Sequence, residues 1–166
     1  MPLHERVARH LDALGVKYTV LRHSPVHTAA AAAQASHVAR REFAKVVVLH
    51  TAPAGYLMLV LPASEHLDLP TVRRVCGHHR LEFATKEELA RLFPGCDPGA
   101  VPPFGGLFGV ETVIDQCFLE HDESDGDITF AAGSPEEAVV MRFDDYARAA
   151  GPFSHEAHLH ARPARA

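Results

Sequence analysis

The run Phe43–Leu49 constrains the fold of this chain most, because a single lysine interrupts an apolar sequence rich in valine. Segments of this composition are typical of buried strands, where alternation would put Lys45 on one face with Val47 and Leu49. Burying an ammonium group costs free energy unless it has a partner. Lys45 therefore either extends its charged end into water from a packed stem, or lies in an apolar cleft where it binds an anion. The strand alone leaves both interpretations open.

A second unusual segment, residues 94–106, is rich in proline and glycine. Proline fixes φ and glycine permits positive φ, so the segment could be a rigid surface loop. Such a loop can also turn consecutive backbone amides toward a ligand, where they stabilise an anion or a carbonyl oxygen. Neither this segment nor Lys45 names a reaction by itself.

Length and charge narrow the class of protein. The chain has 166 residues, of which 47% are hydrophobic and 22% charged, with a net charge of −5. These values predict one globular domain, and the negative balance argues against general binding of DNA or RNA. Arginine pairs such as Arg40–Arg41 could still form a local rim for one RNA end, or could simply be solvated. No apolar stretch approaches the roughly 20 residues that cross a membrane, and Met1–Arg6 lacks the layout of a signal peptide, so we expect a cytoplasmic protein.

Helical and strand patterns alternate along the chain, which predicts an α+β fold with a mixed or antiparallel sheet. Thr28 is expected to cap an alanine-rich helix, and Thr85 with Glu88 forms the pattern of a capping box. Asp144 could cap a last helix. Few apolar residues follow Pro152, so the expected domain spans residues 1–152 and residues 153–166 are expected to form a loose tail.

The usual catalytic and cofactor motifs are missing from the sequence. There is no Walker A loop, no GxSxG elbow and no HExxH helix. Three widely spaced cysteines, Cys76, Cys96 and Cys117, fit neither a disulfide framework nor a zinc ribbon. His155, His158 and His160 come nearest to metal-ligand spacing, but they lie in the expected tail. We therefore expect no metal site and no cofactor.

Several motifs, taken in order, resemble the YbaK/ProX aminoacyl-tRNA deacylase family, which includes the editing domain of bacterial prolyl-tRNA synthetases. Ala44–Lys45 enters a valine-rich strand after a Thr-Ala-Ala helix start, and Gly99–Pro103 matches the GxxxP loop of the family. Phe104–Gly105 continues this loop in the manner of the ProX branch. The remaining matches are Ala84–Leu89, the strand of Asp115, and Ala132–Ser134. Together they cover roughly residues 11–143.

The resemblance implies a single domain with a mixed, barrel-like sheet surrounded by helices. It implies a trans-editing enzyme that hydrolyses the ester of a mischarged tRNA, assisted by a ribose hydroxyl of the substrate, with Lys45 orienting the tRNA end. An aminoacyl-tRNA synthetase is a further possible partner. The resemblance assigns Lys45 and Gly99 to catalysis and the following residues to substrate binding: Thr28, Ala100, Val101, Pro102, Pro103 and Gly133.

Two departures from the family pattern keep the substrate open. Val46 follows the lysine where many members have threonine, and prolines occupy both positions 102 and 103. Both changes point to the ProX branch without naming the amino acid, although a small one such as alanine or serine fits a size-excluding cleft. The main alternative is a non-catalytic module of the same fold that holds a tRNA end or a synthetase. A third is a hydrolase of another small acyl ester, with Lys45 as base.

Overall fold

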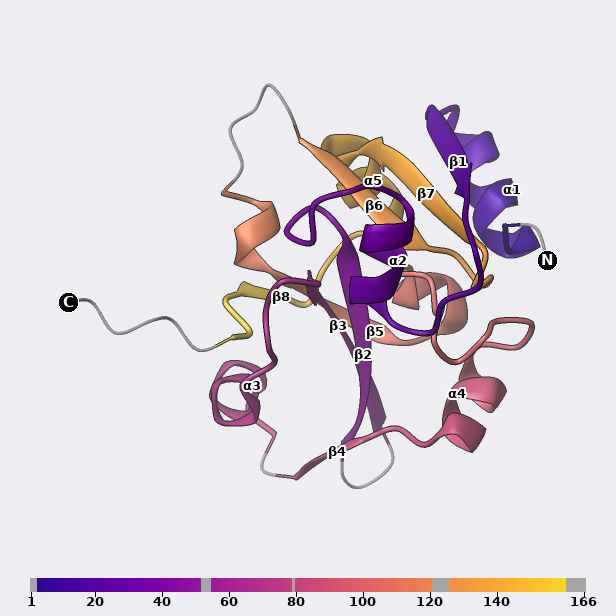
Figure 1. Cartoon of the computed structure of the whole chain (residues 1–166). Coiled ribbons are helices and arrows are strands. Elements are labelled where there is room, and N and C mark those ends of the chain that lie inside the picture. Colours follow the sequence, from indigo (N-terminus) through magenta and orange to yellow (C-terminus); the bar gives the residue numbers. More distant parts are fainter. Residues whose placement is uncertain (1–2, 52–54, 79, 121–125, 161–166) are drawn as a thin grey trace.

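The computed structural model describes residues 3–51, 55–78, 80–120 and 126–160, which fold into two sheets and surrounding helices (Figure 1). The helices are α1 (Glu5–Leu14), α2 (Ala29–Ala35), α3 (Leu69–Cys76), α4 (Lys86–Leu92) and α5 (Phe143–Ala150), with 3₁₀ turns η1 (Gly105–Phe108) and η2 (Gln116–Phe118). The strands are β1 (Tyr18–Arg22), β2 (Ala44–Thr51), β3 (Gly55–Pro62), β4 (Leu81–Phe83), β5 (Glu111–Asp115), β6 (Asp127–Ala131), β7 (Glu137–Arg142) and β8 (His155–Ala157).

The larger sheet has the strand order β4-β2-β3-β5-β8, and the smaller has the order β1-β7-β6. In the larger sheet β2 pairs antiparallel with β3 and β4, whereas β5 lies parallel to β3 and to β8. The smaller sheet is antiparallel throughout. The prediction of a single α+β domain with a mixed sheet is therefore confirmed.

The sheet expected to be barrel-like is not closed into a barrel. Among the described residues the two sheets meet at one isolated bridge, between Phe43 and Thr129, and remain separate ladders. Fully buried side chains of both sheets instead share one apolar core, including Val60, Ile114 and Phe130. Tyr146 of α5 completes this core. Two separate sheets can bury their apolar faces as fully as a closed barrel does, because side chains from the two inner faces interdigitate in one core.

Helix ends follow local sequence signals. Thr28 accepts a hydrogen bond from the Ala31 N–H, and Thr85 with Glu88 forms the predicted capping box. The predicted cap of the last helix is wrong: α5 begins at Phe143 and its N-cap is Arg142, which places Asp144 inside the first turn. A carboxylate is also favourable there, because it faces the positive end of the helix dipole. None of the helices in the described ranges is long and apolar enough to span a bilayer.

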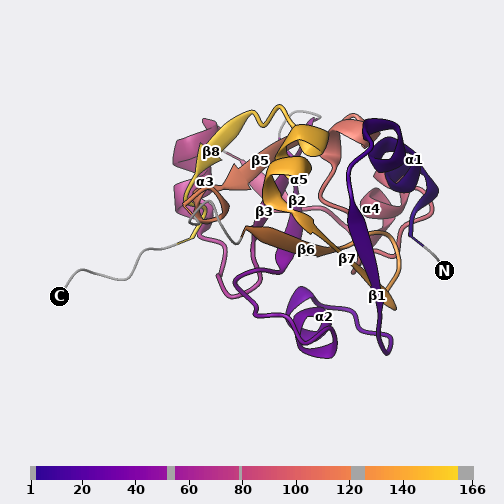
Figure 2. The same cartoon turned by 90° about the horizontal axis from the view of Figure 1, so that it is seen from above.

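The chain does not become a loose tail after Pro152. β8 pairs with β5, and Leu159 is fully buried in a second apolar cluster on the outer face of the larger sheet, together with Leu49, Leu57 and Val72. The prediction of a tail is thus wrong for residues 153–160, while residues 161–166 lie outside the described part. The sequence hides this strand because β8 is only three residues long. Figure 2 shows β8 beside α3 at one end of the molecule.

We predict that Leu159→Ala lowers the free energy of unfolding by about 2–5 kcal/mol, because the substitution leaves a cavity in the apolar cluster of the larger sheet. Chemical denaturation measures this change. The matched control is Leu119→Ala, since Leu119 is 38% exposed and its loss should cost less than about 0.5 kcal/mol. Equal effects of the two substitutions would mean that residues 153–160 do not pack on the sheet.

Candidate functional site

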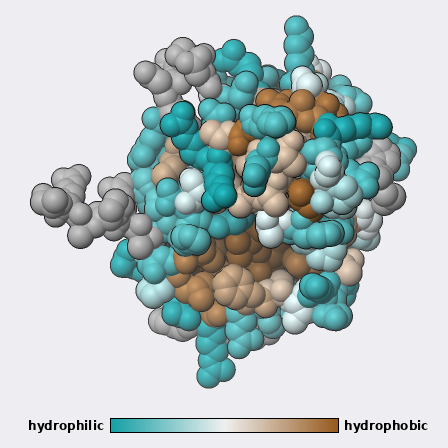
Figure 3. All heavy atoms as spheres, in the orientation of Figure 1, coloured by the Kyte–Doolittle hydropathy of each residue, from teal (hydrophilic) through white to brown (hydrophobic). Residues whose placement is uncertain are grey.

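A cavity of about 280 Å³ opens between α2, the start of β2 and the loop that contains Gly99. Its walls come from four parts of the chain: residues 23–32, residues 43–47, residues 98–101, and residues 131–137 around the turn between β6 and β7. Hydrophilic side chains surround an apolar hollow below α2 on this face of the molecule (Figure 3). An apolar pocket with a few polar groups is the usual form of a small-molecule site.

Lys45 reaches this cavity from the larger sheet. The Lys45 backbone pairs with Leu61 on β3, and its side chain is half-buried with Nζ donating to the Glu65 carbonyl at 2.6 Å. Burial lowers the pKa of Lys45 from its ordinary value, and the nearby Glu65 carboxylate opposes that shift. The lysine is therefore a partly desolvated cation at the edge of an apolar cavity, where an anion would be held more strongly than in water.

The alanine-rich helix α2 supplies the opposite wall. Thr28 and Ala29 line the cavity at its N-terminal end, and the Thr28 hydroxyl accepts from Ala31 N–H at 3.1 Å. Ala32 packs with Phe43 of the strand entrance and Ala138 of β7 in a small apolar cluster. Small side chains on this face let the helix lie close to the sheet, which limits the width of the cavity.

The loop before Pro102 is held by its own polar contacts. Asp97 accepts two hydrogen bonds, from the Gly99 N–H to Oδ1 at 2.8 Å and from the Ala100 N–H to the backbone carbonyl at 2.9 Å. These two amides are thus not directed at a ligand, contrary to what the loop composition suggests. The Val101 N–H has no hydrogen-bond partner among the described residues. Of the amides of Gly99, Ala100 and Val101, that of Val101 is therefore the one free to donate a hydrogen bond to an oxygen atom of a ligand.

Three of the sequence-predicted site residues lie behind the loop and do not line the cavity. The Pro103 carbonyl accepts from the buried Tyr146 hydroxyl at 2.8 Å, and the neighbouring Pro102 is buried as well. Gly133, with φ of +99°, donates to the Ala100 carbonyl at 2.7 Å and accepts from Asp97 N–H. These residues fix the position of the loop, while Lys45, Thr28, Gly99, Ala100 and Val101 line the cavity itself.

Two polar residues at the cavity wall are not among the predicted site residues. Glu137 of β7 is 7% exposed, and its Oε2 atom has no hydrogen-bond partner in the described structure. His23 likewise has a buried Nε2 without a partner. Oε1 of Glu137 lies 3.4 Å from Arg22 Nε. From the sequence, His23 flanks a turn near a strand end, where it could line a site although a structural or solvated role is the commoner one. Glu137 follows Glu136 without any motif, so only the folded chain brings Glu137 to the site.

The cysteines are poorly suited to act as nucleophiles. Burial raises the pKa of Cys96 to about 11 and that of Cys117 to about 12, and it raises that of Cys76 as well. These raised pKa values keep the thiols protonated near neutral pH. The thiolate is the reactive form of cysteine, so the protonated thiols are weak nucleophiles. None of them lines the cavity. Ser134 does line it, with its Oγ accepting from the Glu136 N–H.

The sequence matches a known family over most of its length. Residues 23–149 match the family model described as "Aminoacyl-tRNA editing domain". The chain belongs to this family. The matched range contains the cavity and the loop residues that support it.

Two named relatives agree with that membership. The chain is 28% identical over 152 residues to the "Multifunctional Ser/Thr-tRNA deacylase ProXp-y" of Escherichia coli strain K12, covering 90% of this chain and 89% of the relative. It is 23% identical over 146 residues to the "Prolyl-tRNA editing protein ProX" of Acetoanaerobium sticklandii, covering 87% and 88%.

Two crystal structures share the fold of this editing domain. One is the hypothetical protein APE2540, with a TM-score of 0.79 and 22% identity, covering 95% of this chain and 100% of the other. The second is described as a candidate trans-editing enzyme for prolyl-tRNA synthetase, with a TM-score of 0.75 and 23% identity, covering 97% and 100%.

We predict that Gly99→Ala destabilises this editing domain by about 1–3 kcal/mol, because the new Cβ would lie 2.7 Å from the His27 carbonyl oxygen. Either the loop or the chain before α2 must move. Urea denaturation measures the loss. Gly106→Ala is the matched control, since a Cβ there meets no atom within 4 Å. If Gly99→Ala were as stable as the control, the close approach of the loop to His27 would be disproved.

Proposed function

We propose that this editing domain is a trans-editing aminoacyl-tRNA deacylase that hydrolyses the ester between a wrongly attached amino acid and a tRNA. The observation that carries the proposal is the cavity that Lys45 and Gly99–Val101 line together, within the range matched by the editing-domain family. The cavity offers a cation for a phosphate and backbone groups for an acyl ester. An activated ester needs positioning and charge stabilisation more than a covalent intermediate.

Lys45 orients the tRNA end in this proposal. Its ammonium would bind a phosphate near the terminal adenosine, and the 2.6 Å hydrogen bond to the Glu65 carbonyl holds the side chain in place before the substrate arrives. Partial burial weakens competition from water for the same charge. Lys45 makes no covalent bond to the substrate.

The reaction would proceed by direct attack of water on the ester carbonyl carbon. The carbonyl oxygen gains negative charge in the tetrahedral intermediate, and the Val101 N–H is the loop donor placed to stabilise it. The bond between that carbon and the ribose oxygen then breaks. A ribose hydroxyl of the substrate relays the proton lost by the water to the leaving ribose oxygen, which yields the free amino acid and the uncharged tRNA. This route agrees with the lack of a cysteine nucleophile at the cavity.

Glu137 would recognise the amino acid by its charge. An aminoacyl ester carries a free α-ammonium group, and the Oε2 atom of Glu137 is a buried acceptor at the cavity wall without a protein partner. A hydrogen bond from an ammonium to a carboxylate satisfies both groups and is stronger than a neutral one. We therefore assign Glu137 to substrate binding, together with Thr28, Gly99, Ala100 and Val101. Pro102, Pro103 and Gly133 support the loop.

The size of the cavity favours a small amino acid. At about 280 Å³ it lies at the lower end of ligand pockets, and α2 presents only alanines and Thr28 to it. Alanine, serine and threonine are therefore the side chains we propose, and the relative from Escherichia coli is named for serine and threonine. The partner is an aminoacylated tRNA 3′ end, with an aminoacyl-tRNA synthetase as a possible second partner. We propose the cytoplasm as the compartment where the protein would meet such substrates.

A deacylation assay tests the proposal. Purified protein is mixed with a panel of tRNAs charged correctly or wrongly with alanine, serine, threonine and larger amino acids, and release of the amino acid is followed over time. We expect hydrolysis of at least one small, mischarged substrate. Binding of tRNA without release of any amino acid would instead favour the non-catalytic module, and release only from small esters without tRNA would favour a general acyl hydrolase.

For Lys45→Ala in the same assay, we predict that kcat/KM falls by at least about 100-fold, or about 2.7 kcal/mol, because the phosphate loses its cation. Lys86→Ala is the matched control, since Lys86 is an exposed lysine at the start of α4. Circular dichroism should show both variants folded. Unchanged activity of a folded Lys45→Ala variant would remove Lys45 from the site.

We predict that Glu137→Gln lowers kcat/KM by about tenfold or more for a substrate with a free α-ammonium, because the charge-assisted hydrogen bond is lost. An N-acetylated aminoacyl-tRNA has no such ammonium, so wild type and variant should hydrolyse it at similar rates. Glu136→Gln is the control, because Glu136 is exposed. Equal loss on both substrates would contradict recognition of the ammonium by Glu137.

A further inference from the structure

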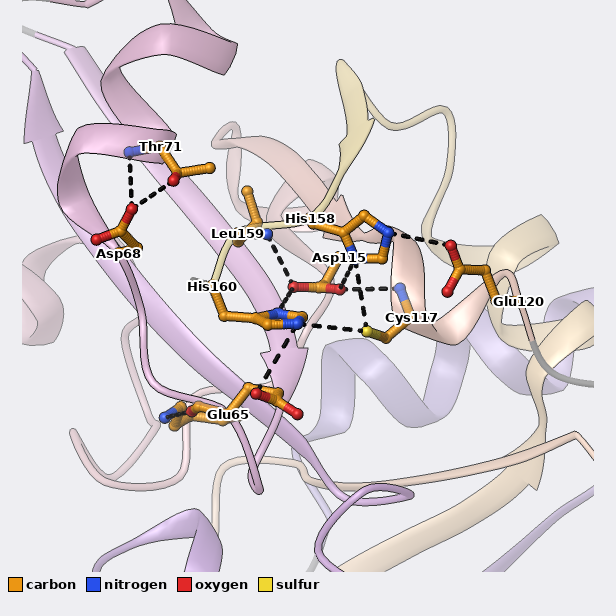
Figure 4. A network of polar contacts seen from close by, with 10 residues as sticks. Glu65, Asp68, Thr71, Asp115, Cys117, Glu120, His158, Leu159 and His160 are labelled. Carbon is orange, nitrogen blue, oxygen red and sulfur yellow. Dashed lines mark hydrogen bonds and ion pairs between the residues drawn. The ribbon is translucent and has the colours of Figure 1, made fainter. Parts of the chain in front are cut away.

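A cluster of metal-ligating side chains lies outside the editing cavity, where the C-terminal segment meets the end of β5 (Figure 4). Asp115 ends β5, Cys117 lies in η2 directly after it, and His158 and His160 follow β8. One ligand atom from each of these four residues lies within 4.8 Å of the other three. We propose that this cluster is a binding site for Zn²⁺, with Cys117, His158 and His160 as ligands and Asp115 as the carboxylate that orients His160.

The distances between the ligand atoms suit one small ion. Cys117 Sγ lies 3.7 Å from His158 Nδ1 and 3.7 Å from His160 Nε2. Zinc bonds of about 2.3 Å to sulfur and about 2.0 Å to nitrogen, at tetrahedral angles, separate such atoms by about 3.5 Å. A zinc ion at the centre of these atoms therefore requires only small movements of the side chains.

Each histidine is oriented by a carboxylate on its far side. His160 Nδ1 lies 3.0 Å from Asp115 Oδ2, and His158 Nε2 lies 3.0 Å from Glu120 Oε1. A hydrogen on each of these nitrogens leaves the opposite nitrogen with a free lone pair, and those are the two nitrogens beside the sulfur. Carboxylates that hold ligand histidines in this way are typical of protein zinc sites. Figure 4 shows both rings turned toward Cys117.

The cluster is built into the fold. Asp115 is fully buried, and besides His160 it accepts hydrogen bonds from the backbone N–H groups of Cys117 at 2.8 Å and Leu159 at 3.0 Å. One carboxylate thus fixes the backbone on both sides of the proposed ion. The parallel pairing of β5 with β8 brings these segments together, although about 40 residues separate them in sequence.

Charge and access also fit a dication. Besides Asp115, the carboxylates of Glu120 and Glu65 lie at the rim, with Glu65 Oε2 3.8 Å from His160 Nε2. A surface pocket lined by Glu65, Cys117 and Glu120 gives an ion a route to the sulfur from solvent. A thiolate with imidazoles favours zinc over the hard cations Mg²⁺ and Ca²⁺, which prefer oxygen ligands. The expectation of no metal rested on a loose tail, and the structure removes that premise.

The test is a metal titration of the untagged full-length protein, because an added histidine tag would itself bind zinc. Protein stripped with a chelator is titrated with Zn²⁺ against a chromophoric competitor. We expect one tight equivalent, with affinity lowered by more than about 100-fold in Cys117→Ser and in His158→Gln. Cys76→Ser and His66→Gln are the controls, since these residues lie outside the cluster, and both should keep the wild-type affinity.

A spectrum with Co²⁺ identifies the ligands independently. Bound cobalt should give intense visible bands of a tetrahedral site and a near-ultraviolet thiolate band, and the thiolate band should vanish in Cys117→Ser but remain in Cys76→Ser. Circular dichroism confirms that the variants are folded. If Cys117→Ser does not fold, His158→Gln carries the test, because that side chain is 16% exposed. Absence of a tight equivalent in wild type, or unchanged affinity in folded His158→Gln, would overturn the proposal.

Discussion

The antiparallel pairing of β2 with β3 is the interaction on which the rest of this structure depends. Its eight residue pairs run from Ala44–Pro62 to Thr51–Gly55. The pairing fixes Lys45 opposite Leu61, and the chain that continues from β3 returns the Glu65 carbonyl to the Lys45 ammonium. One face of the two strands packs on the core between the sheets, and the other packs on α3 and Leu159. A lysine is tolerated on this strand because its ammonium group lies at the edge of the cavity and donates a hydrogen bond to the Glu65 carbonyl.

The loop opposite Lys45 is positioned by residues that do not touch the cavity. Gly133 and Asp97 tie it to the turn between β6 and β7, and Tyr146 holds the Pro103 carbonyl from the core. Rigid supports of this kind reduce the motion that a bound ester would otherwise have to freeze. The loop motif Gly99–Pro103 therefore contains two kinds of residue. Gly99–Val101 line the cavity, whereas Pro102 and Pro103 hold the loop in position.

The editing cavity and the proposed zinc site share one connection through Glu65. Its backbone carbonyl accepts from Lys45, and its carboxylate lies beside His160. The two sites nonetheless have different physical requirements. The cavity needs a partly exposed cation and small side chains on its walls, whereas the metal cluster needs two carboxylates, the buried Asp115 and the exposed Glu120, that orient its imidazoles. Their proximity follows from the larger sheet, because β2, β3, β5 and β8 lie next to one another in it.

The sequence by itself determined the element types other than that of the short strand β8, the capping box at Thr85 and the lysine on a buried strand, because period, caps and composition are local properties. With its motif order, it also indicated the family, and five of the eight predicted site residues line the cavity. Only the tertiary structure decided that the sheets remain two layers, that Pro102, Pro103 and Gly133 support the loop, and that Glu137 lines the cavity. It alone placed His158 and His160 beside Cys117. These features depend on strand pairing between distant segments, and no local pattern carries information about such pairing.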